Sequence, residues 1–388
     1  MSPLLLLALA AFGVSMAFAL VVCGWRDALA KARGQATSSR VGVVPVEGLS
    51  VVIPARDAAA TLVPLLQDLY AQQWPKELLE VLVVDDGSSD GTADLVRGMG
   101  RTWPGLRVLA AHGAGKKAAL TEGIAEARWP WVLLTDADVR CGPERVPEVM
   151  RVLQGQRPDL LLLPVETRGA GGLLQRVQCE EQAALQGVAA GTALQGMAVL
   201  ANGANLAFGK EAFLAVGGYT GDRWASGDDI VLLHRMRKAV RAVAYLALPE
   251  VVVSAQAEST LVGFWQQRLR WAGKMRGVGG AGRWAALAGL LVPWFLLFAT
   301  CSITVEALLP QRPLAILLLL ASAWMLWLLP VLGLVREVKR FLASAPRGPR
   351  SPSGSWGTVL SLLAFTCYAP MVALASLVVK PRWKGRRI

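Results

Sequence analysis

The sequence has little charge for its length, and this is the first constraint on its fold. Only 18% of the 388 residues are charged, whereas 54% are hydrophobic, and the mean hydropathy is +0.44. This composition excludes a disordered or fibrous chain and differs from that of an ordinary soluble globule, which carries more charge. The length corresponds to about two or three domain-sized units. Because the apolar residues are unevenly distributed, we expect a soluble part and a membrane-embedded part.

Cysteine pairs and histidine clusters are also missing. The five cysteines show no CxxC spacing, and three of them lie in apolar runs, so we expect neither a disulfide framework nor a zinc site. This usage is consistent with a reduced cytosolic compartment. With two histidines in the whole chain, metal or triad chemistry based on histidine is not expected. The residues in question are Cys23, Cys141, Cys179, Cys301, Cys367, His112 and His234.

Basic residues outnumber acidic ones, 40 to 28, and the formal net charge is +12. Such an excess suits nucleic acid, an anionic membrane surface or a phosphorylated substrate. Many of the basic residues flank apolar segments, which favours the membrane. They do not form a groove interleaved with aromatic residues, so we expect no nucleic-acid partner.

The first apolar run covers residues 3–23 and contains no charge. It is long enough to cross about 30 Å of hydrocarbon. No basic residue precedes it, as one would before a secretory signal, although Ala17-Phe18-Ala19 keeps cleavage as an alternative. Basic residues follow at once from Arg26, and positive charge stays cytoplasmic, so the N-terminus should lie outside. We expect a transmembrane helix over 1–25 and a basic linker over 26–48.

Residues 49–255 alternate between short β-branched runs and segments of helical spacing. The runs end in turn residues and read as parallel strands buried on both faces. We expect strands at 49–56, 79–88, 106–111 and 131–139, and helices at 61–72, 91–99 and 116–127. This order predicts an α/β fold with a doubly wound sheet, whose ligands bind beyond the carboxyl ends of the strands. Five acids fall there: Asp57, Asp85, Asp86, Asp136 and Asp138.

Three more apolar runs occupy the C-terminal membrane region, 284–379, after an interfacial region at 256–283. They cover about residues 284–308, 314–335 and 357–379, and each is long enough to span. Three crossings from a cytoplasmic domain would leave the basic tail, residues 380–388, outside, against the positive-inside rule. We expect about three helices, with 357–379 re-entrant or interfacial as the alternative.

Two acidic motifs follow buried strands. Asp85-Asp86 repel each other unless they meet donors or a cation, and an Asx turn with a helix cap is an equally good interpretation. Asp136 and Asp138 are two residues apart in a strand and therefore face the same side. Such a pair suits Mg²⁺ or Mn²⁺ shared with a diphosphate, although isolated DxD triplets also occur by chance.

Three further segments have both a structural and a chemical interpretation. Lys116-Lys117 precedes a helix and could hold an anion such as a pyrophosphate, or form a solvated turn. Asp228-Asp229 begins a helix and could cap it, or provide a general base. The stretch FWQQRLRWAGKMR suits an amphipathic helix at the membrane surface and can carry a site as well.

The segments VVIPARD, VVDDGS, GKKAALTEGI, DAD, NGANLAF, GDD and QRLRW occur in that order. The set resembles the membrane-bound branch of the family-2 inverting glycosyltransferases with a GT-A fold. That branch includes cellulose, chitin and hyaluronan synthases, ceramide glucosyltransferases and bacterial lipid glycosyltransferases. The resemblance covers about residues 49–275, and the flanking spans match it in architecture.

The resemblance implies the following roles, which we take as expectations. The donor is a nucleotide-diphospho-sugar, in the first instance a UDP-sugar, and Mg²⁺ or Mn²⁺ on Asp138 assists. Asp229 is the catalytic base, and Asp228 stands where the family has Glu. The donor side comprises Pro54, Arg56, Asp57, Asp86, Lys117 (or Lys116), Asp136 and Asp138. The acceptor and diphosphate side comprises the NGAN loop with Asn205, then Asp228, Gln267, Arg270 and Trp271.

Two departures affect the donor side. The family's PxxNE is here Pro54-Ala55-Arg56-Asp57-Ala58, and the usual ALN is Ala119-Leu120-Thr121. The predicted reaction is transfer to a lipid or membrane-associated hydroxyl, with inversion, on the cytoplasmic side of an integral membrane protein. A processive polysaccharide synthase is the alternative, but it needs a channel and usually more spans. A noncatalytic membrane scaffold is disfavoured because the acids at 86, 136, 138 and 229 are all present.

Overall fold

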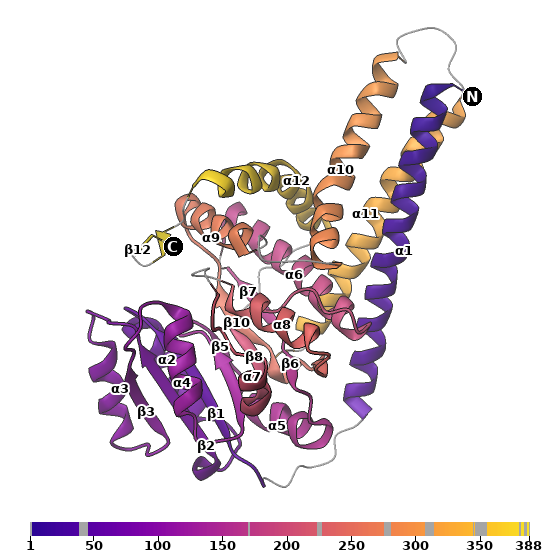
Figure 1. Cartoon of the computed structure of the whole chain (residues 1–388). Coiled ribbons are helices and arrows are strands. Elements are labelled where there is room, and N and C mark those ends of the chain that lie inside the picture. Colours follow the sequence, from indigo (N-terminus) through magenta and orange to yellow (C-terminus); the bar gives the residue numbers. More distant parts are fainter. Residues whose placement is uncertain are drawn as a thin grey trace.

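The computed structural model describes most of the chain and divides it into a catalytic domain and a set of long apolar helices. The described residues are 2–38, 46–169, 171–222, 227–274, 281–306, 314–343, 345, 355–379, 382–383 and 386–387. In Figure 1 the α/β domain lies below, the helices α1, α10 and α11 project from one side, and α12 runs across the top.

The first half of the main sheet confirms the predicted parallel strands. β1 (Leu49–Ala55), β2 (Leu79–Asp85), β3 (Leu106–Ala110) and β4 (Trp131–Thr135) lie in the order β3-β2-β1-β4, all parallel. Alternate residues of β1 face opposite sides, so Val51 and Ile53 enter one hydrophobic core and Val52 the other. A sheet buried on both faces requires apolar residues at nearly every position, which explains the continuous runs.

Helices cover both faces of this sheet. α2 (Ala59–Tyr70), α3 (Thr92–Gly100) and α5 (Arg145–Gln156) contribute to the core on the Val51 side. α4 (Lys116–Glu126), α7 (Lys210–Ala215) and α8 (Asp228–Lys238) contribute to the core on the Val52 side. The predicted doubly wound arrangement is therefore present, and its helices begin close to the carboxyl ends of the strands.

The second half of the sheet is mixed rather than parallel. β8 (Asn205–Gly209) runs antiparallel to both β4 and β6 (Leu160–Leu162), and β9 (Val243–Tyr245) is parallel to β6. A second sheet has the order β5-β10-β7, with bounds Arg140–Cys141, Val253–Gln256 and Val165–Arg168. The apolar runs after residue 139 are only three to five residues long in these strands, too short to reveal strand direction.

Two helices connect the sheets with the membrane region. α6 (Leu173–Leu194) and α9 (Leu261–Lys274) lie between the sheet and the long apolar helices in Figure 1. The remaining short elements are the 3-10 turns Lys76–Leu78 and Pro249–Val251 and the strand pair β11 (Arg382–Trp383) and β12 (Arg386–Arg387).

Three long helices form the projecting bundle: α1 (Pro3–Ser38), α10 (Ala281–Glu306) and α11 (Leu314–Ala343). Ala11 of α1, Ala299 of α10 and Ala323 of α11 are fully buried in their common core, and such small residues let helices approach closely. α1 continues as a helix to Ser38, through much of the segment expected to be a linker. The N-terminus lies at the far end of the bundle (Figure 1).

The bundle is docked on the catalytic domain through α6. A Cβ atom at Gly191 would lie 2.2 Å from Cβ of Trp25 on α1, so only glycine fits at this contact. Near the same end of the bundle, Arg33 Nη2 lies 3.1 Å from Glu337 Oε1, which joins α1 to α11. The basic ends of both helices therefore lie on the side of the catalytic domain.

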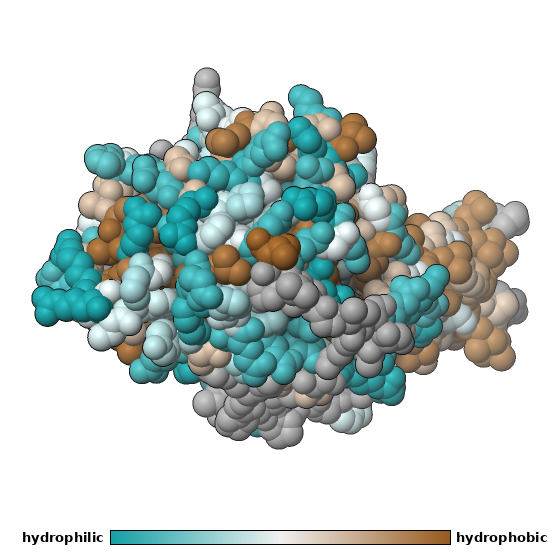
Figure 2. All heavy atoms as spheres, turned by 90° about the horizontal axis from the view of Figure 1, so that it is seen from below, coloured by the Kyte–Doolittle hydropathy of each residue, from teal (hydrophilic) through white to brown (hydrophobic). Residues whose placement is uncertain are grey.

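The fourth apolar helix, α12 (Ser355–Val378), has a different direction. By length and composition α1, α10, α11 and α12 could each cross a membrane. In Figure 1, however, α12 lies across the bundle direction, above α9 and α6. Figure 2, from below, shows a largely hydrophilic catalytic domain, with hydrophobic surface gathered on the distant projection at the right.

Candidate active site

Two of the five acids predicted at the strand ends, Asp136 and Asp138 after β4, line one large cavity of about 1360 Å³. Pro54, near the end of β1, and Arg56, directly after β1, line it too. The carboxyl ends of neighbouring parallel strands meet at one edge of the sheet, which brings these residues together. Asp228 and Asp229, at the start of α8, line the same cavity.

Asp86 lies under this edge and not on the cavity wall. Its side chain is 5% exposed, and its Oδ1 accepts a hydrogen bond from the Gly115 N–H at 3.0 Å. Arg56 donates from Nη1 to the Asp86 carbonyl oxygen at 3.0 Å, with Asp86 Oδ2 3.7 Å away. Asp86 thus ties the end of β2 to the turn before α4 and orients Arg56.

Asp57 also lies outside the cavity lining. It has a positive φ of 45°, and its Oδ1 accepts hydrogen bonds from the Ser89 N–H and hydroxyl, at 2.8 and 3.2 Å. The hydrogen bond from the Ser89 N–H lowers the pKa of this exposed carboxyl below its usual value. Asp85 accepts in the same way from Ser88. The turn interpretation that was given to Asp85-Asp86 is therefore present in the structure at Asp85.

Lys116 is the cation at the centre of the acidic site. Its Nζ lies 2.8 Å from Asp136 Oδ1 and 3.3 Å from Asp228 Oδ2, so it joins the end of β4 to the start of α8. Burial alone would lower the pKa of Lys116, but the carboxylates of Asp136 and Asp228 outweigh it and raise the pKa well above the usual value. Lys117 points elsewhere and pairs with Asp222, outside the cavity lining. Of the two lysines considered from the sequence, the structure brings Lys116 to the site.

Asp229 accepts backbone hydrogen bonds and also faces the cavity. Its Oδ1 accepts from the Ile230 N–H at 2.9 Å and its Oδ2 from the Gly203 N–H at 3.2 Å. The carboxylates at 228 and 229 also lie in the first turn of α8, where the helix dipole stabilises negative charge. The side chain is 5% exposed and lines the cavity, so it remains within reach of a bound hydroxyl.

The NGAN loop contributes through two residues other than Asn205. Asn202 lines the cavity, and a Cβ at Gly203 would lie 2.5 Å from Asp228 Oδ2, so the loop backbone packs directly on the acidic pair. The structure does not bring Asn205 to the acceptor side. Its amide is fully buried, accepts from Arg145 Nη2 at 2.8 Å and donates to the carbonyl oxygens of Pro164 and Val251. Asn205 is therefore a core residue, because β8 places its side chain inward.

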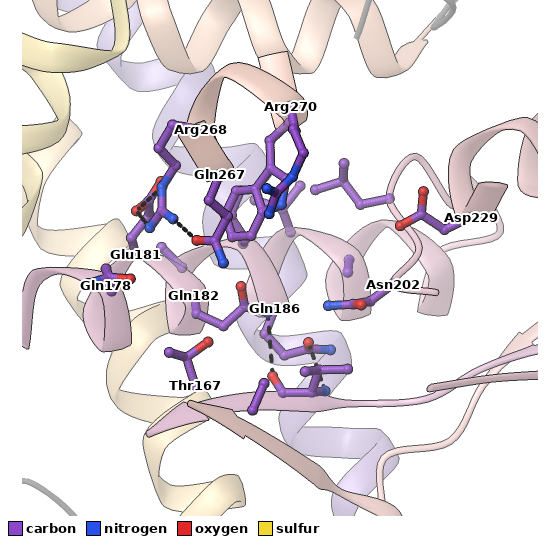
Figure 3. Close-up of a pocket in the computed structure, with 18 of the residues that line it drawn as sticks. Thr167, Gln178, Glu181, Gln182, Gln186, Asn202, Asp229, Gln267, Arg268 and Arg270 are labelled. Atoms are coloured by element: carbon purple, nitrogen blue, oxygen red, sulfur yellow. Dashed lines mark hydrogen bonds and ion pairs between the residues drawn. The ribbon is translucent and has the colours of Figure 1, made fainter. Parts of the chain in front are cut away.

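The QxxRW residues line the side of the cavity that lies across from Asp229. Gln267, Arg270 and Trp271, all on α9, line the cavity, and Figure 3 shows Gln267 and Arg270 above it with Asp229 at the far side. Desolvation lowers the pKa of Arg270, against the opposing effect of Glu258 and Asp138 nearby. Since an arginine stays charged under such a shift, α9 provides a cation close to the exposed Asp138 carboxylate.

The residues at this site fit a divalent ion whose remaining ligands come from a bound substrate. Among the residues the structure describes, no group of three or more His, Cys, Asp or Glu side chains could enclose a metal. Asp138 is exposed on the cavity, and Asp136 is partly engaged by Lys116. Mg²⁺ usually binds one or two carboxylates together with substrate phosphates and water, which this donor set allows.

Part of the site was not predicted from the sequence. Gln178, Gln182 and Gln186 form a polar row along α6, spaced by four residues, and all three line the cavity (Figure 3). Glu181, on the same helix, pairs with Arg268 of α9. The four-residue spacing of the three amides along one face of the helix was the available signal.

The chain matches two descriptions of one protein family. "Glycosyl transferase family 2" matches residues 50–183, and "Glycosyl transferase family group 2" matches residues 131–375. The second match covers well over half of the chain, so the chain belongs to this glycosyltransferase family. The predicted family and its GT-A type of fold are thereby confirmed.

The most informative relatives fall into two groups. Poly-β-1,6-N-acetyl-D-glucosamine synthase of Staphylococcus aureus is 27% identical over 244 residues, which is 60% of this chain and 55% of that protein. Dolichol-phosphate mannosyltransferase of Mycosarcoma maydis is 33% identical over 141 residues, 35% of this chain and 48% of that protein. The chain thus spans about half the length of the curated relatives it matches.

One solved structure shares the fold over most of its length. The mannosyltransferase PcManGT from Pyrobaculum calidifontis, solved with GDP-Man and Mn²⁺, superposes with a TM-score of 0.51 at 18% identity. The match covers 92% of this chain and 99% of the other. At this identity the likeness establishes the fold.

Proposed function

We propose that this protein transfers a sugar from a nucleotide-diphospho-sugar to a hydroxyl group of a membrane lipid, with inversion and with the help of a divalent ion. The donor occupies the edge of the sheet near Arg56, Lys116, Asp136 and Asp138. The acceptor enters from the membrane side, so that the site lies on the cytoplasmic face of an integral membrane protein.

The observation that carries the proposal is the continuity of the cavity. The same cavity that contains the acids of β4 and α8 reaches the apolar faces of the long helices. Its apolar lining includes Phe18, Val22, Leu290, Trp327, Val331 and Leu362. A site for a water-soluble acceptor has no need of a wall built from membrane helices, whereas a lipid acceptor needs a polar end beside the donor and an apolar end in the bilayer.

The mechanism is a direct displacement. Asp229 accepts the proton of the acceptor hydroxyl, which attacks the anomeric carbon while the nucleoside diphosphate leaves from the opposite face. Arg270 and Lys116 offset the negative charge that grows on the leaving phosphate. A divalent ion bound at Asp138 would supply further charge stabilisation on the diphosphate. A single displacement inverts the anomeric configuration.

A processive polysaccharide synthase is the second candidate, and the polar row on α6 favours it. Gln178, Gln182 and Gln186 line the cavity opposite Gln267 and Trp271, and amides with an aromatic ring are suited to sugar hydroxyls. One of the relatives is named as a polysaccharide synthase. A growing glycan would then take the place of the lipid.

The test is a donor screen on membranes that contain the protein, with radiolabelled UDP-GlcNAc, UDP-glucose or GDP-mannose and Mn²⁺. Label in a chloroform–methanol extract supports the lipid acceptor, and label in a high-mass polymer supports the synthase. Absence of nucleotide release with every donor would contradict the enzyme assignment.

The metal is tested in the same assay. EDTA should abolish transfer, and added Mn²⁺ should restore it, because the diphosphate loses its counter-charge without the ion. Asp138→Ala should remove transfer at any Mn²⁺ concentration, whereas Asp94→Ala, an exposed acid on α3, should not. Full activity in EDTA would exclude the ion from the reaction.

A further inference from the structure

The buried ion pair between α6 and α9 is the strongest feature that the proposed reaction does not yet use. Glu181 and Arg268 are 6% and 4% exposed at their side chains. Arg268 Nε lies 3.1 and 3.0 Å from the two carboxylate oxygens of Glu181, and Nη2 also donates to Oε2. The contact is bidentate, the geometry in which a guanidinium is held most firmly.

Arg268 in turn contacts two residues of the QxxRW segment. Its Nη1 donates to Gln267 Oε1, and its Cζ lies 4.3 Å from the centroid of the Trp271 ring. Cζ also lies 4.4 Å from the centroid of the Phe264 ring, so two aromatic rings lie within cation–π distance of the guanidinium. Positions 264, 268 and 271 lie on one face of α9, since residues three and four apart are neighbours on a helix.

We infer that Glu181 and Arg268 are a positioning pair for the acceptor end of the site. Both residues line the cavity themselves, and the pair fixes the direction of Gln267 and Trp271, which line it as well. Figure 3 shows Gln267 across the cavity from Asp229. Glu181 on α6 fixes the position of Arg268, and Arg268 contacts the Gln267 amide and the Trp271 indole. These two side chains therefore keep one orientation when an acceptor binds. The inference rests on the proposed transfer reaction and names residues within it.

The neighbouring residue offers a matched control. Glu180 is equally buried and pairs with Lys339 of α11, while accepting from the Thr358 hydroxyl of α12 at 2.7 Å. It therefore stabilises the contact of α6 with two apolar helices, and none of its hydrogen bonds involves α9. Glu180 lines the same cavity as Glu181, so Glu180→Gln removes a buried charge of the same kind from the same helix and the same wall without releasing Gln267 or Trp271.

The experiment compares transfer with donor hydrolysis. Membranes containing each variant receive radiolabelled donor and Mn²⁺, and the product made by the wild type is counted beside the free sugar released to water. Glu181→Gln should lower the ratio of transfer to hydrolysis about tenfold or more, because a displaced acceptor wall misaligns the attacking hydroxyl. Glu180→Gln should leave the ratio at the wild-type value even if it reduces the amount of folded protein.

Arg268→Lys provides the second variant. It keeps a cation beside Glu181 but loses the fork that reaches Gln267 and the flat face that stacks on Trp271. Arg268→Lys should lower the ratio of transfer to hydrolysis as Glu181→Gln does. If Glu181→Gln is not recovered from membranes, Arg268→Lys alone tests the positioning role. A wild-type ratio in Arg268→Lys, or an equal loss in Glu180→Gln, would overturn the positioning role. Absence of both products in the wild type would instead overturn the proposed function itself.

Discussion

Asp229 is the residue whose chemistry is easiest to separate from its structural role. Its Oδ1 accepts from the N–H of the next residue, Ile230, and its Oδ2 accepts from the Gly203 N–H, while the side chain lines the cavity. An asparagine has the same shape and keeps an oxygen for one of these two hydrogen bonds, but it cannot take a proton at neutral pH.

Asp229→Asn should therefore lower transfer by about 10²- to 10⁴-fold, the usual contribution of a general base, while donor affinity is retained. Transfer is measured with the donor that the wild type uses, and donor affinity by equilibrium binding. Asp94→Asn, in the first turn of α3, is the control and should behave as the wild type. More than about a tenth of wild-type turnover in Asp229→Asn would remove Asp229 from the role of base.

Glycine is needed at position 203 because Asp228 packs against its backbone, and not because of a positive φ. Its added Cβ would lie 2.5 Å from Asp228 Oδ2 and 3.3 Å from Lys116 Nζ, and both side chains are largely buried. Gly203→Ala should displace them and lower transfer about tenfold with little loss of fold. Gly98→Ala, in α3 with open space around it, is the control and should be neutral or slightly stabilising. Wild-type transfer in Gly203→Ala would show that the arrangement of Lys116 and Asp228 is not needed.

At the scale of elements, the placement of α12 bears on the position of the basic C-terminal tail. Three C-terminal crossings would put this tail outside, against the positive-inside rule. The buried face of α12 carries Thr358 and Ser361, which bond to Glu180 and to the Val177 carbonyl oxygen of α6, while Leu363, Met371 and Leu374 are exposed. A helix with one face on the protein and an apolar face outward suits the plane of a membrane interface. With α12 in that plane, we expect three helices to cross and the basic C-terminal tail to lie on the cytoplasmic side.

The expected topology can be measured with reporter fusions in a bacterial inner membrane. Green fluorescent protein fused to Ile388 should fluoresce, and alkaline phosphatase at the same position should be inactive, because an interfacial α12 predicts a cytoplasmic tail. Fusions after Glu306, at the end of α10, are the control and should give the opposite result. Phosphatase activity at Ile388 would mean that α12 crosses the membrane.

At the scale of the whole molecule, the catalytic domain and the bundle form one cavity only if α6 remains against α1. The contact at Gly191 leaves no space for a methyl group beside Trp25. Gly191→Ala should cost about 1–3 kcal/mol by overpacking and lower the unfolding midpoint by several degrees. Gly155→Ala, where the added Cβ meets nothing within 4 Å, is the control. Thermal unfolding in detergent measures both, and equal midpoints would show that the docking contact adapts without strain.

Local patterns in the sequence were sufficient for the first four strands of the main sheet, the helices between them, the long apolar helices and the order of the acids. Continuous apolar runs fixed β1, β2 and β4, because a strand buried on both faces needs them, and the acids had to follow at the carboxyl ends. The apolar helices were equally visible, since each must be long enough for the hydrocarbon layer.

The tertiary structure decided what depends on side-chain direction and on contacts between distant residues. Neighbours in the chain diverge, so Lys116 enters the site while Lys117 pairs with Asp222, and Asn205 turns into the core. The pairing of Glu181 with Arg268, 87 residues apart, and the crosswise direction of α12 arise from packing between elements. Hydropathy and spacing describe one segment at a time, and they contain no information on which segment another will meet.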